Sequence, residues 1–480
     1  MTPKVLNIVT GINRISVPTS GSLIFVNDLY GAMPDIHTTF LGRTPVDQAW
    51  KAAFDHLITL STTKRPQGPD FDRYVDELTR EVGSLIEQIQ PDAIHAQYLG
   101  FALSLAFTRT AGTIPIIAIA HGPDVMVAER SAAEREVMIE VAAASAAIVT
   151  PTAVLANRID RLTGRRFTDR LTVIPWGIRL TDARVRDQPP TGTGPLSLVH
   201  AGRLDDNKST ITAVEALALT DQPHHLTVIG KGPLREHLEQ RALELGLRDR
   251  VDFDPFLPRA ELWRRLPNFD AFVFTTRGLE AFGLVLIEAQ AHGLPVAYSD
   301  LPGVSEILGS GGVPYTPGDP HSLAVALDEM GRDFHRRKAL TKAALNNARR
   351  YNITTTGRQL RELTLRVTSS TSSSSRTRPS SSPPAERPAT SSPPPGSRSS
   401  PTSAPTTSAP SDEPDQAPTP TPGNATRTSS PAPRSPTSKP PAGTAPSPAP
   451  CPAARGCPAH TPVTRPGSSC TLRHPGAGTG

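Results

Sequence analysis

The sequence predicts an α/β protein with two doubly wound domains, each built on a parallel sheet, followed by a disordered tail. Short apolar runs alternate with segments of helical periodicity across residues 4–366, and a Pro- and Gly-rich segment at 187–195 interrupts this alternation. Near residue 367 the composition changes to Pro, Ser and Thr. Strands that alternate with helices indicate parallel sheets with helices on both faces.

The first half contains six apolar runs that we expect to form strands, because compact apolar runs that end near Gly or Pro are typical of buried parallel strands. Two longer segments, 70–90 and 131–146, have helical periodicity or are rich in alanine, and a short helix is expected between the last two strands. The expected strands are "KVLNIVTG", "IHTTFLG", "PDAIHAQY", "IPIIAIAHG", "AAIVTPTA" and "LTVIPWG".

The alternation restarts after residue 195. We expect strands at "LSLVHAG", "HHLTVIGKG", "RVDFDPF", "AFVFTT" and "LPVAYS". Helices are expected at "TITAVEALAL", "LREHLEQRALELG", "RAELWRRLPN", "GLVLIEAQAHG" and "HSLAVALDEMG", and 334–366 is predicted to be helical throughout. Ligands of such sheets bind beyond the carboxyl ends of the strands, so the chemistry is expected in the strand-to-helix loops.

The segment 368–480 accounts for the positive net charge of +5. It holds ten of the 50 Lys and Arg but only four of the 45 Asp and Glu, so the rest of the chain carries about −1. With few large apolar residues it cannot offset its ordering entropy by burial, and we predict a disordered spacer that activity does not need. The rest of the chain lacks the polycationic character that would indicate a nucleic-acid partner.

All three cysteines lie in the tail. The predicted folded part therefore uses no disulfide, cysteine metal site or thiol nucleophile, and a zinc site in the tail is disfavoured because no apolar framework surrounds it. The N-terminal apolar run is too short for a signal peptide, and no run is long enough to span a membrane. We expect a cytoplasmic protein, with peripheral membrane attachment as the alternative.

Three strand-to-helix loops of the second half carry polar side chains or paired glycines. In "HAGRLDDNKS", Arg203 and Lys208 precede a helix, where two cations and free amides suit a diphosphate; two solvated charges are the alternative. In "VIGKGPL", position 235 is Arg where a dinucleotide fingerprint needs its third glycine, so the glycines indicate a turn or close backbone approach. In "RGLEAFG", Glu280 lies in the loop at the carboxyl end of the strand, and Glu288 lies in the following helix.

The loop with Glu280 could bind a nucleotide sugar. Carboxylates accept hydrogen bonds from sugar hydroxyls, and amides at a helix start bind phosphate. Taken alone, a polar loop and a partly exposed helix glutamate explain the pattern as well. His121, directly after the strand "IIAIA", is either a buried structural histidine or a group that lines the cleft. The pair Asp252 and Asp254 matches the spelling of an Asp-x-Asp metal motif, but its place in another strand indicates a coincidence.

The order of these motifs resembles the retaining glycosyltransferases of family 4, which have the GT-B architecture of two Rossmann-like domains facing a cleft. The resemblance covers about residues 4–366. It rests on "HAQY", "IAHGPD", "LTVIPWGI", "AGRLDDNKS", "VIGKGPL" and "LEAFGLVLIEAQAHGLPVAYSDLPGVSEI".

The resemblance implies a role for each candidate residue. Arg203 and Lys208 would neutralise the donor diphosphate, Glu288 would bind the ribose, and Glu280 would contact the transferred sugar. His121 would line the reaction centre and contact the same sugar. Donor binding would also use the loop glycine Gly21 and the backbone amides of Phe282, Gly283 and Leu284.

The resemblance also implies the domain organisation. It predicts an acceptor-side domain (1–186), a linker (187–195), a nucleotide-sugar-binding domain (196–349), a helix that crosses back to the first domain (350–366) and the tail (367–480).

The sequence departs from the family pattern at several positions. Gly21 is followed by Ser22 rather than a second glycine, Trp176 stands where asparagine is usual, and Arg179 where aspartate is usual. Ser209 replaces a glycine and Lys231 an aspartate. The donor-side residues are retained, whereas these changes leave the acceptor open among small molecules, lipids and glycans.

The function that the resemblance implies is metal-independent, retaining transfer of a sugar from a nucleotide-diphosphate sugar to a hydroxyl. UDP is the family's commonest carrier, so UDP-glucose or UDP-N-acetylglucosamine is the first expectation, and no cofactor is implied. The alternatives are an epimerase or phosphorylase on the same fold, or a non-catalytic binding protein whose tail recruits partners.

Overall fold

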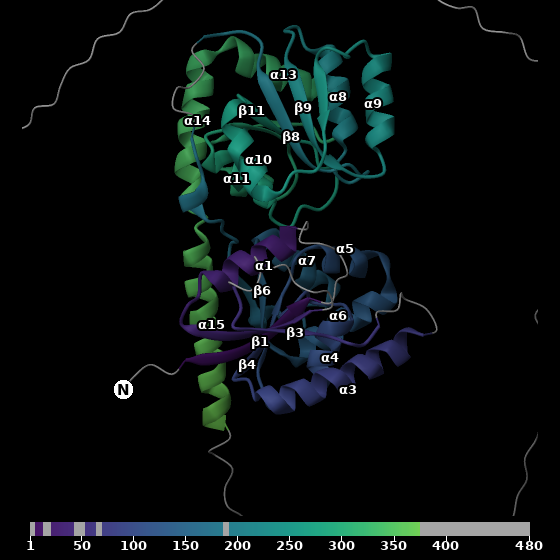
Figure 1. The fold of residues 1–480 in the computed structure, drawn as a ribbon, viewed down its shortest axis with the longest axis vertical. Helices are drawn as coiled ribbons and strands as arrows, with labels where there is room; N and C mark the ends of the chain where they lie inside the picture. The colour runs from purple at the N-terminus through teal and green to yellow at the C-terminus, as the bar shows by residue number, and fades with distance from the viewer. Residues whose placement is uncertain (1–4, 13–20, 43–52, 64–69, 186–191, 375–480) are drawn as a thin grey trace, which may run out of the picture. The chain divides into compact units, whose positions relative to one another are not determined.

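A computed structural model of the chain describes residues 5–12, 21–42, 53–63, 70–185 and 192–374 (Figure 1). The three cysteines and most of the predicted tail lie outside these ranges, as does the start of the predicted linker. Two separate parallel sheets, each flanked by helices, make up the described part. The predicted fold class of two Rossmann-like α/β sheets is therefore confirmed.

The first sheet has seven parallel strands within the described residues, in the order β3-β2-β1-β4-β5-β6-β7. Its central strands are buried along their whole length, which explains why the sequence shows continuous apolar runs rather than alternation. The strands are β1 (Leu6–Ile12), β2 (Ile36–Gly42), β3 (His56–Thr59), β4 (Ala93–Gln97), β5 (Ile116–Ile119), β6 (Ser145–Thr150) and β7 (Leu171–Val173).

The second sheet has six parallel strands within the described residues, in the order β10-β9-β8-β11-β12-β13. The strand order reverses direction between β8 and β11, which is the position where ligands bind in open parallel sheets. The strands are β8 (Ser197–Arg203), β9 (His225–Lys231), β10 (Val251–Asp254), β11 (Ala271–Phe274), β12 (Val296–Ser299) and β13 (Gly312–Tyr315).

The helices follow the strands as predicted, with four additional ones among the described residues, α1, α4, α5 and α12. Those that follow the first strands are α1 (Gly21–Gly31), α3 (Phe71–Ile89), α4 (Ala102–Thr110), α5 (Pro123–Arg130), α6 (Ala132–Ala144) and α7 (Ala153–Leu162). Those that follow residue 196 are α8 (Thr210–Leu219), α9 (Arg235–Glu244), α10 (Arg259–Arg265), α11 (Leu284–Ala291), α12 (Val304–Leu308), α13 (Pro320–Arg332), α14 (Phe334–Ala348) and α15 (Ile353–Ser374).

The prediction of an uninterrupted helix over 334–366 is wrong. The chain leaves the helical conformation between α14 and α15, where Asn352 forms an isolated parallel bridge with Ile178. The Ile178 amide donates to the Tyr351 carbonyl at 2.9 Å, and the Ile353 amide donates to the Ile178 carbonyl at 3.0 Å. Two connecting segments are thus hydrogen-bonded to each other. The second helix then continues to Ser374, past the predicted boundary at 366.

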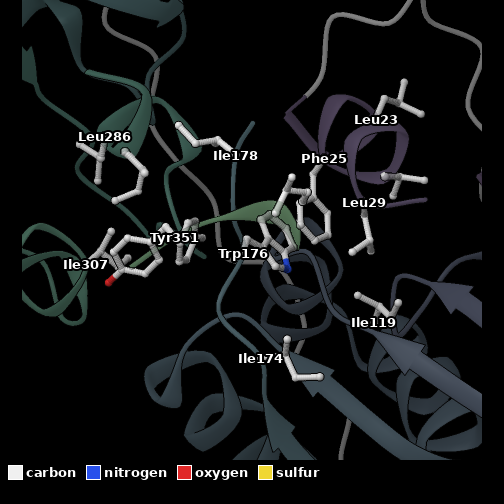
Figure 2. Packing of buried hydrophobic residues seen from close by; sticks show 14 of the residues in the cluster. Leu23, Phe25, Leu29, Ile119, Ile174, Trp176, Ile178, Leu286, Ile307 and Tyr351 are labelled. Carbon is white, nitrogen blue, oxygen red and sulfur yellow. The ribbon is translucent and has the colours of Figure 1, made fainter. Parts of the chain in front are cut away.

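A buried apolar cluster surrounds the segment that follows β7. Trp176 stacks on Phe25 of α1 with ring centroids 4.3 Å apart and an interplanar angle of 19°. Figure 2 shows these two rings facing each other, with Ile119 and Ile174 below them and Ile178 above them to the left. The position where the family usually has asparagine is therefore part of the apolar core in this chain.

The last helix, α15, is bound to the first sheet by buried polar contacts. His95 of β4 lies between two hydroxyl groups: its Nδ1 is 2.8 Å from the Tyr30 hydroxyl and its Nε2 is 3.0 Å from Thr364 Oγ1. Thr356 donates to the Pro175 carbonyl at 2.9 Å. The polar character of α15 at these positions is thus matched by partners on β4 and in the segment after β7.

No helix among the described residues is long and apolar enough to cross a membrane.

Gly177→Ala should destabilise the protein by about 1–3 kcal/mol, because overpacking of this size forces a backbone shift. A Cβ at this position would lie 2.4 Å from the Asn352 carbonyl carbon and the Ile353 nitrogen. Urea unfolding should show a lower midpoint at unchanged slope. Gly83→Ala in α3 is the control: its Cβ would contact only Thr110 Cγ2, at 3.4 Å, and alanine favours helix, so this variant should be at least as stable as the wild type.

Acid should weaken the fold through its buried histidines. Burial lowers the pKa of His95 and of His121 to about 3, so both are neutral in the folded chain. The unfolded chain takes up these protons below its pKa of about 6.5, so stability falls as the pH drops from 6.5 towards 3. Between pH 7 and 5 each such histidine should remove about 2 kcal/mol from the free energy of unfolding. His95→Gln should therefore lose about 2 kcal/mol less than the wild type over that interval; an equal loss would contradict this.

Candidate active site

Two predicted site residues meet at the carboxyl edge of the second sheet. Lys208 follows β8 and Glu280 follows β11, the two strands between which the order reverses. Lys208 Nζ lies 2.7 Å from Glu280 Oε2 and 3.3 Å from Thr276 Oγ1, and 5.6 Å from the centre of the Phe274 ring. Both charged side chains are mostly buried. The sheet topology therefore brings together a cation and a carboxylate that lie 72 residues apart.

Arg203 is not part of this ion pair. It ends β8, its side chain is 68% exposed, and its Nη2 lies 3.0 Å from Asp205 Oδ2. An exposed ion pair contributes little free energy, so the guanidinium can leave Asp205 for another anion at small cost.

The loop after Glu280 runs directly into α11. The Phe282 side chain is buried and packs edge-on against Tyr351 with ring centroids 5.4 Å apart. Gly283 has a φ of +74°, a left-handed conformation that glycine adopts without strain, and Leu284 is the first residue of the helix. The first-turn amides of a helix have no acceptor within the helix, and the helix dipole makes this end positive.

Glu288 lies on α11, buried, and forms an ion pair with Arg259 of α10. The Arg259 Nε is 2.9 Å from Glu288 Oε1, and the same guanidinium also pairs with Asp28 of α1. Asp28 in turn lies 2.9 Å from the Arg179 Nε. The two carboxylates raise the pKa of Arg259 more than burial lowers it. Two cations and two anions therefore neutralise each other in this cluster, which joins the predicted ribose-binding glutamate to α1.

His121 lies after β5 at the carboxyl edge of the first sheet, almost completely buried. Its Nε2 lies 2.8 Å from Gln97 Oε1, while its Nδ1 has no hydrogen-bond partner among the described residues. The ring is surrounded by Tyr98, Trp176 and Phe25, with centroids at 4.6, 4.9 and 6.1 Å. Burial keeps this imidazole neutral.

A close contact joins the loops that carry His121 and Glu280. A Cβ on Gly122 would lie 2.5 Å from the Ala281 Cβ, so only glycine permits this approach, and the Gly122 φ of +98° also requires it. Thr152, the N-cap of α7, donates to the Ala281 carbonyl at 3.3 Å. His121 directly precedes Gly122, and Glu280 directly precedes Ala281. The contact therefore places these two site residues on the same side of the molecule.

Gly21 lies near Leu284, where the loop after β11 enters α11, but Gly21 itself belongs to a helix. The expectation of a loop glycine is wrong, because Gly21 is the first residue of α1. A Cβ there would lie 3.9 Å from Leu284 Cδ1, an ordinary contact, so no atom of the described residues demands glycine at this position. The close approach to Leu284 still places the start of α1 beside the start of α11.

The glycines of "VIGKGPL" permit close approach of the backbone, as the sequence indicated. A Cβ on Gly230 would lie 2.0 Å from the Gly202 oxygen, and one on Gly232 would lie 2.2 Å from the Leu204 oxygen. On the edge strand β10, Asp252 lies 3.5 Å from His225 Nε2, and Asp254 forms an ion pair with Arg265 at 2.6 Å.

Sequence reasoning did not find three residues that contact the candidate site: Arg259, Asp28 and Gln97. Gln97 was visible as part of "HAQY" but had no assigned role. Arg259 and Asp28 lie on helix faces where a single charge is usually solvated, so their pairing with Glu288 becomes visible only in three dimensions.

Two family models match consecutive parts of the chain. One, described as "Glycosyltransferase Family 4", matches residues 37–182, and the other, "Glycosyl transferases group 1", matches residues 182–347. Together they span more than half of the chain and include every candidate site residue except Gly21.

Curated relatives include glycogen synthase of Mycobacterium tuberculosis, 32% identical over 188 residues, which are 38% of this chain and 45% of the relative. D-inositol 3-phosphate glycosyltransferase of Xylanimonas cellulosilytica is 32% identical over 233 residues, 44% of this chain and 55% of the relative. The chain spans about half the length of the curated relatives that it matches.

Solved structures share the fold. Sucrose-phosphate synthase from Thermosynechococcus elongatus has a TM-score of 0.65 at 20% identity and covers 76% of this chain and 100% of its own. HepE of Anabaena, solved in complex with UDP and glucose, has a TM-score of 0.62 at 18% identity and covers 75% and 99%. The two family matches show that the chain belongs to the family 4 glycosyltransferases, and the solved structures and the paired Rossmann-like sheets show that it has the GT-B fold.

Proposed function

We propose that the protein is a retaining, metal-independent glycosyltransferase that moves a sugar from a nucleotide-diphosphate sugar, UDP-linked as the first expectation, to a hydroxyl of an acceptor. The observation that carries this proposal is the ion pair between Lys208 and Glu280 beside the amino end of α11. A cation, a carboxylate and free helix amides are the groups that a sugar diphosphate needs. The UDP complex of HepE supports the choice of UDP for a related fold.

Donor binding would exchange partners at this ion pair. The diphosphate carries more negative charge than Glu280 and would take the Lys208 ammonium, assisted by the exposed Arg203 and the first amides of α11. Glu280 would then accept hydrogen bonds from hydroxyls of the sugar. Glu288 Oε1 faces Arg259, and its second oxygen would accept from the ribose. Glu288 would keep its ion pair with Arg259 in both states, whereas Glu280 would exchange its ion pair with Lys208 for hydrogen bonds from the sugar.

The reaction breaks the bond between the sugar's anomeric carbon and a phosphate oxygen, and leaves negative charge on the nucleoside diphosphate. Lys208, Arg203 and the helix amides would stabilise that charge, which is the role a metal ion has in other transferases. For retention we propose front-face attack: the acceptor oxygen bonds to the anomeric carbon, and its proton passes to the departing phosphate oxygen. A glycosyl adduct on a side chain, found by mass spectrometry of the digested protein, would contradict this.

The direct test offers UDP-, GDP- and ADP-sugars to the full chain, first by thermal shift, because only ligands that bind the folded state raise its melting temperature. Product analysis with the donor that binds then distinguishes the reaction classes. A new glycoside with unchanged anomeric configuration, formed equally in EDTA, is expected. A changed donor sugar would indicate an epimerase, phosphate-dependent release a phosphorylase, and binding without turnover a non-catalytic protein.

Replacing the two glutamates should separate turnover from donor binding. Glu280→Gln should lower kcat by about 10²–10³-fold at nearly unchanged donor KM, because its contact with the sugar strengthens as charge develops. Glu288→Gln should mainly raise the donor KM, by roughly ten-fold, because ribose contacts are the same in ground and transition states. Glu244→Gln is the matched control: this half-exposed glutamate pairs with Arg241 on α9, and its loss should change neither constant. Unchanged turnover in Glu280→Gln would contradict the assignment.

A further inference from the structure

A chain of buried hydrogen bonds begins at His121 and ends in α15. Its first three members are His121, Gln97 of β4 and Tyr30 of α1: His121 Nε2 is 2.8 Å from Gln97 Oε1, and Gln97 Nε2 is 3.2 Å from the Tyr30 hydroxyl. The Tyr30 hydroxyl is 2.8 Å from His95 Nδ1, and His95 Nε2 is 3.0 Å from Thr364 Oγ1. All five side chains are buried.

The direction of each hydrogen bond follows from the groups at its ends. Thr10 gives its one proton to the His95 carbonyl at 2.8 Å, so the Gln97 atom that faces Thr10, at 3.0 Å, must be the amide nitrogen. The Gln97 oxygen therefore faces His121, and His121 Nε2 must donate to it. Thr364 gives its proton to the Leu360 carbonyl at 2.8 Å, so His95 Nε2 donates to Thr364. Tyr30 can then donate to His95 Nδ1.

This order leaves His121 with one tautomer. Both histidines are neutral, because burial lowers the pKa of each to about 3. With its proton on Nε2, His121 has a bare lone pair on Nδ1, which is buried and without a partner among the described residues. The indole Nε1 of the adjacent Trp176 is a buried donor that likewise lacks a partner there. A hydroxyl group, which both donates and accepts, matches this pair of unsatisfied groups.

We propose that Gln97 is a positioning residue that holds His121 in the Nε2–H tautomer, so that Nδ1 accepts a hydrogen bond from a hydroxyl of the transferred sugar. The contact with the sugar rests on the proposed function. The tautomer does not, because it follows from hydrogen bonds within the chain itself.

Hydrogen bonds to the Asp124 side chain fix the positions of Gln97 and His121 relative to each other. The buried Asp124 carboxylate accepts from the amides of Leu99, Gly122 and His121, at 2.7, 2.8 and 3.3 Å. It therefore connects the loop after β4 to the loop after β5. Gln97 also donates to two hydroxyls, so its amide cannot rotate without losing both contacts. The tautomer of His121 is thus set by groups on four elements, β1, α1, β4 and α15, of which α15 is the last to be made.

The test is a ¹⁵N–¹H correlation spectrum of the full chain labelled in its histidine rings, in which the two neutral tautomers have different nitrogen shifts. His121→Asn identifies the His121 signals by their loss. The proposal expects His121 as Nε2–H in the wild type and a shift towards Nδ1–H in Gln97→Leu. Gln97→Glu keeps an oxygen opposite Nε2 and should retain the wild-type tautomer. The proposal would be overturned if His121 were the Nδ1–H tautomer in the wild type. It would also be overturned if His121 in Gln97→Leu kept the wild-type Nε2–H tautomer.

His200 supplies a matched internal control. Its Nδ1 lies 3.0 Å from the Val273 carbonyl, which accepts only, so this buried histidine must be the Nδ1–H tautomer. Its signals should be identical in the wild type and in all Gln97 variants. Thr210→Val removes the hydroxyl 3.1 Å from His200 Nε2 and should change the His200 signals without moving those of His121. Movement of both sets in Gln97→Leu would show a general loss of structure and would count against a specific role.

The sugar contact is tested by comparing UDP-glucose with UDP. UDP-glucose should move the His121 Nδ1 resonance upfield, as hydrogen bonding to a bare ring nitrogen does, and UDP should not. The wild type should bind UDP-glucose more tightly than UDP, and Gln97→Leu should lose that ratio by roughly ten-fold while its affinity for UDP stays the same. Equal losses for both ligands would overturn a positioning role. Absence of binding by either in the wild type would overturn the sugar contact and the proposed function while leaving the tautomer in place.

Discussion

The close packing of Ala281 against the bare Cα of Gly122 is the contact on which the rest of the candidate site depends. It brings the loop after β5 into contact with the loop after β11, which belong to different sheets. The residues that directly precede Gly122 and Ala281 are the site residues His121 and Glu280. Any side chain at position 122 would meet the Ala281 methyl group and would also have to adopt a positive φ. One glycine therefore positions a histidine and a glutamate that the sequence separates by 159 residues.

Charge neutrality governs the remaining polar groups. Lys208 and Glu280 neutralise each other, and Arg259 lies between Asp28 and Glu288, while Arg179 pairs with the other side of Asp28. Buried charges persist only when they are paired in this way, since the desolvation of a lone ion costs several kcal/mol. The change from aspartate, usual in the family, to Arg179 is explained by this cluster, because Asp28 needs the second cation once Arg259 is shared with Glu288.

The sequence alone predicted the strands, and the loops that carry the candidate site, better than it predicted the contacts between those loops and the helices. The apolar runs from "KVLNIVTG" to "LPVAYS" became strands because only buried parallel strands are apolar on both faces, and the loops after β8 and β11 could therefore be expected at one edge. The break at 349–352 carries no Gly or Pro and is caused by hydrogen bonds to Ile178, far away in the sequence. The residues around Gly21 carry no sequence signal for the start of a helix, so the sequence predicted a loop there. Ion pairs between helices leave no local sequence pattern, so the sequence did not predict that Arg259 pairs with Glu288.

The hydrogen bond between His95 and Thr364 joins residues 269 positions apart, and this distance has a consequence for biosynthesis. A ribosome adds about 5–20 residues each second, so roughly 15–50 s pass between the synthesis of these two residues. During that interval the first sheet is exposed without α15, and the buried face of β4 lacks its last hydrogen-bond acceptor. The hydrogen-bond network of the first sheet therefore stays incomplete until the final helix emerges and docks.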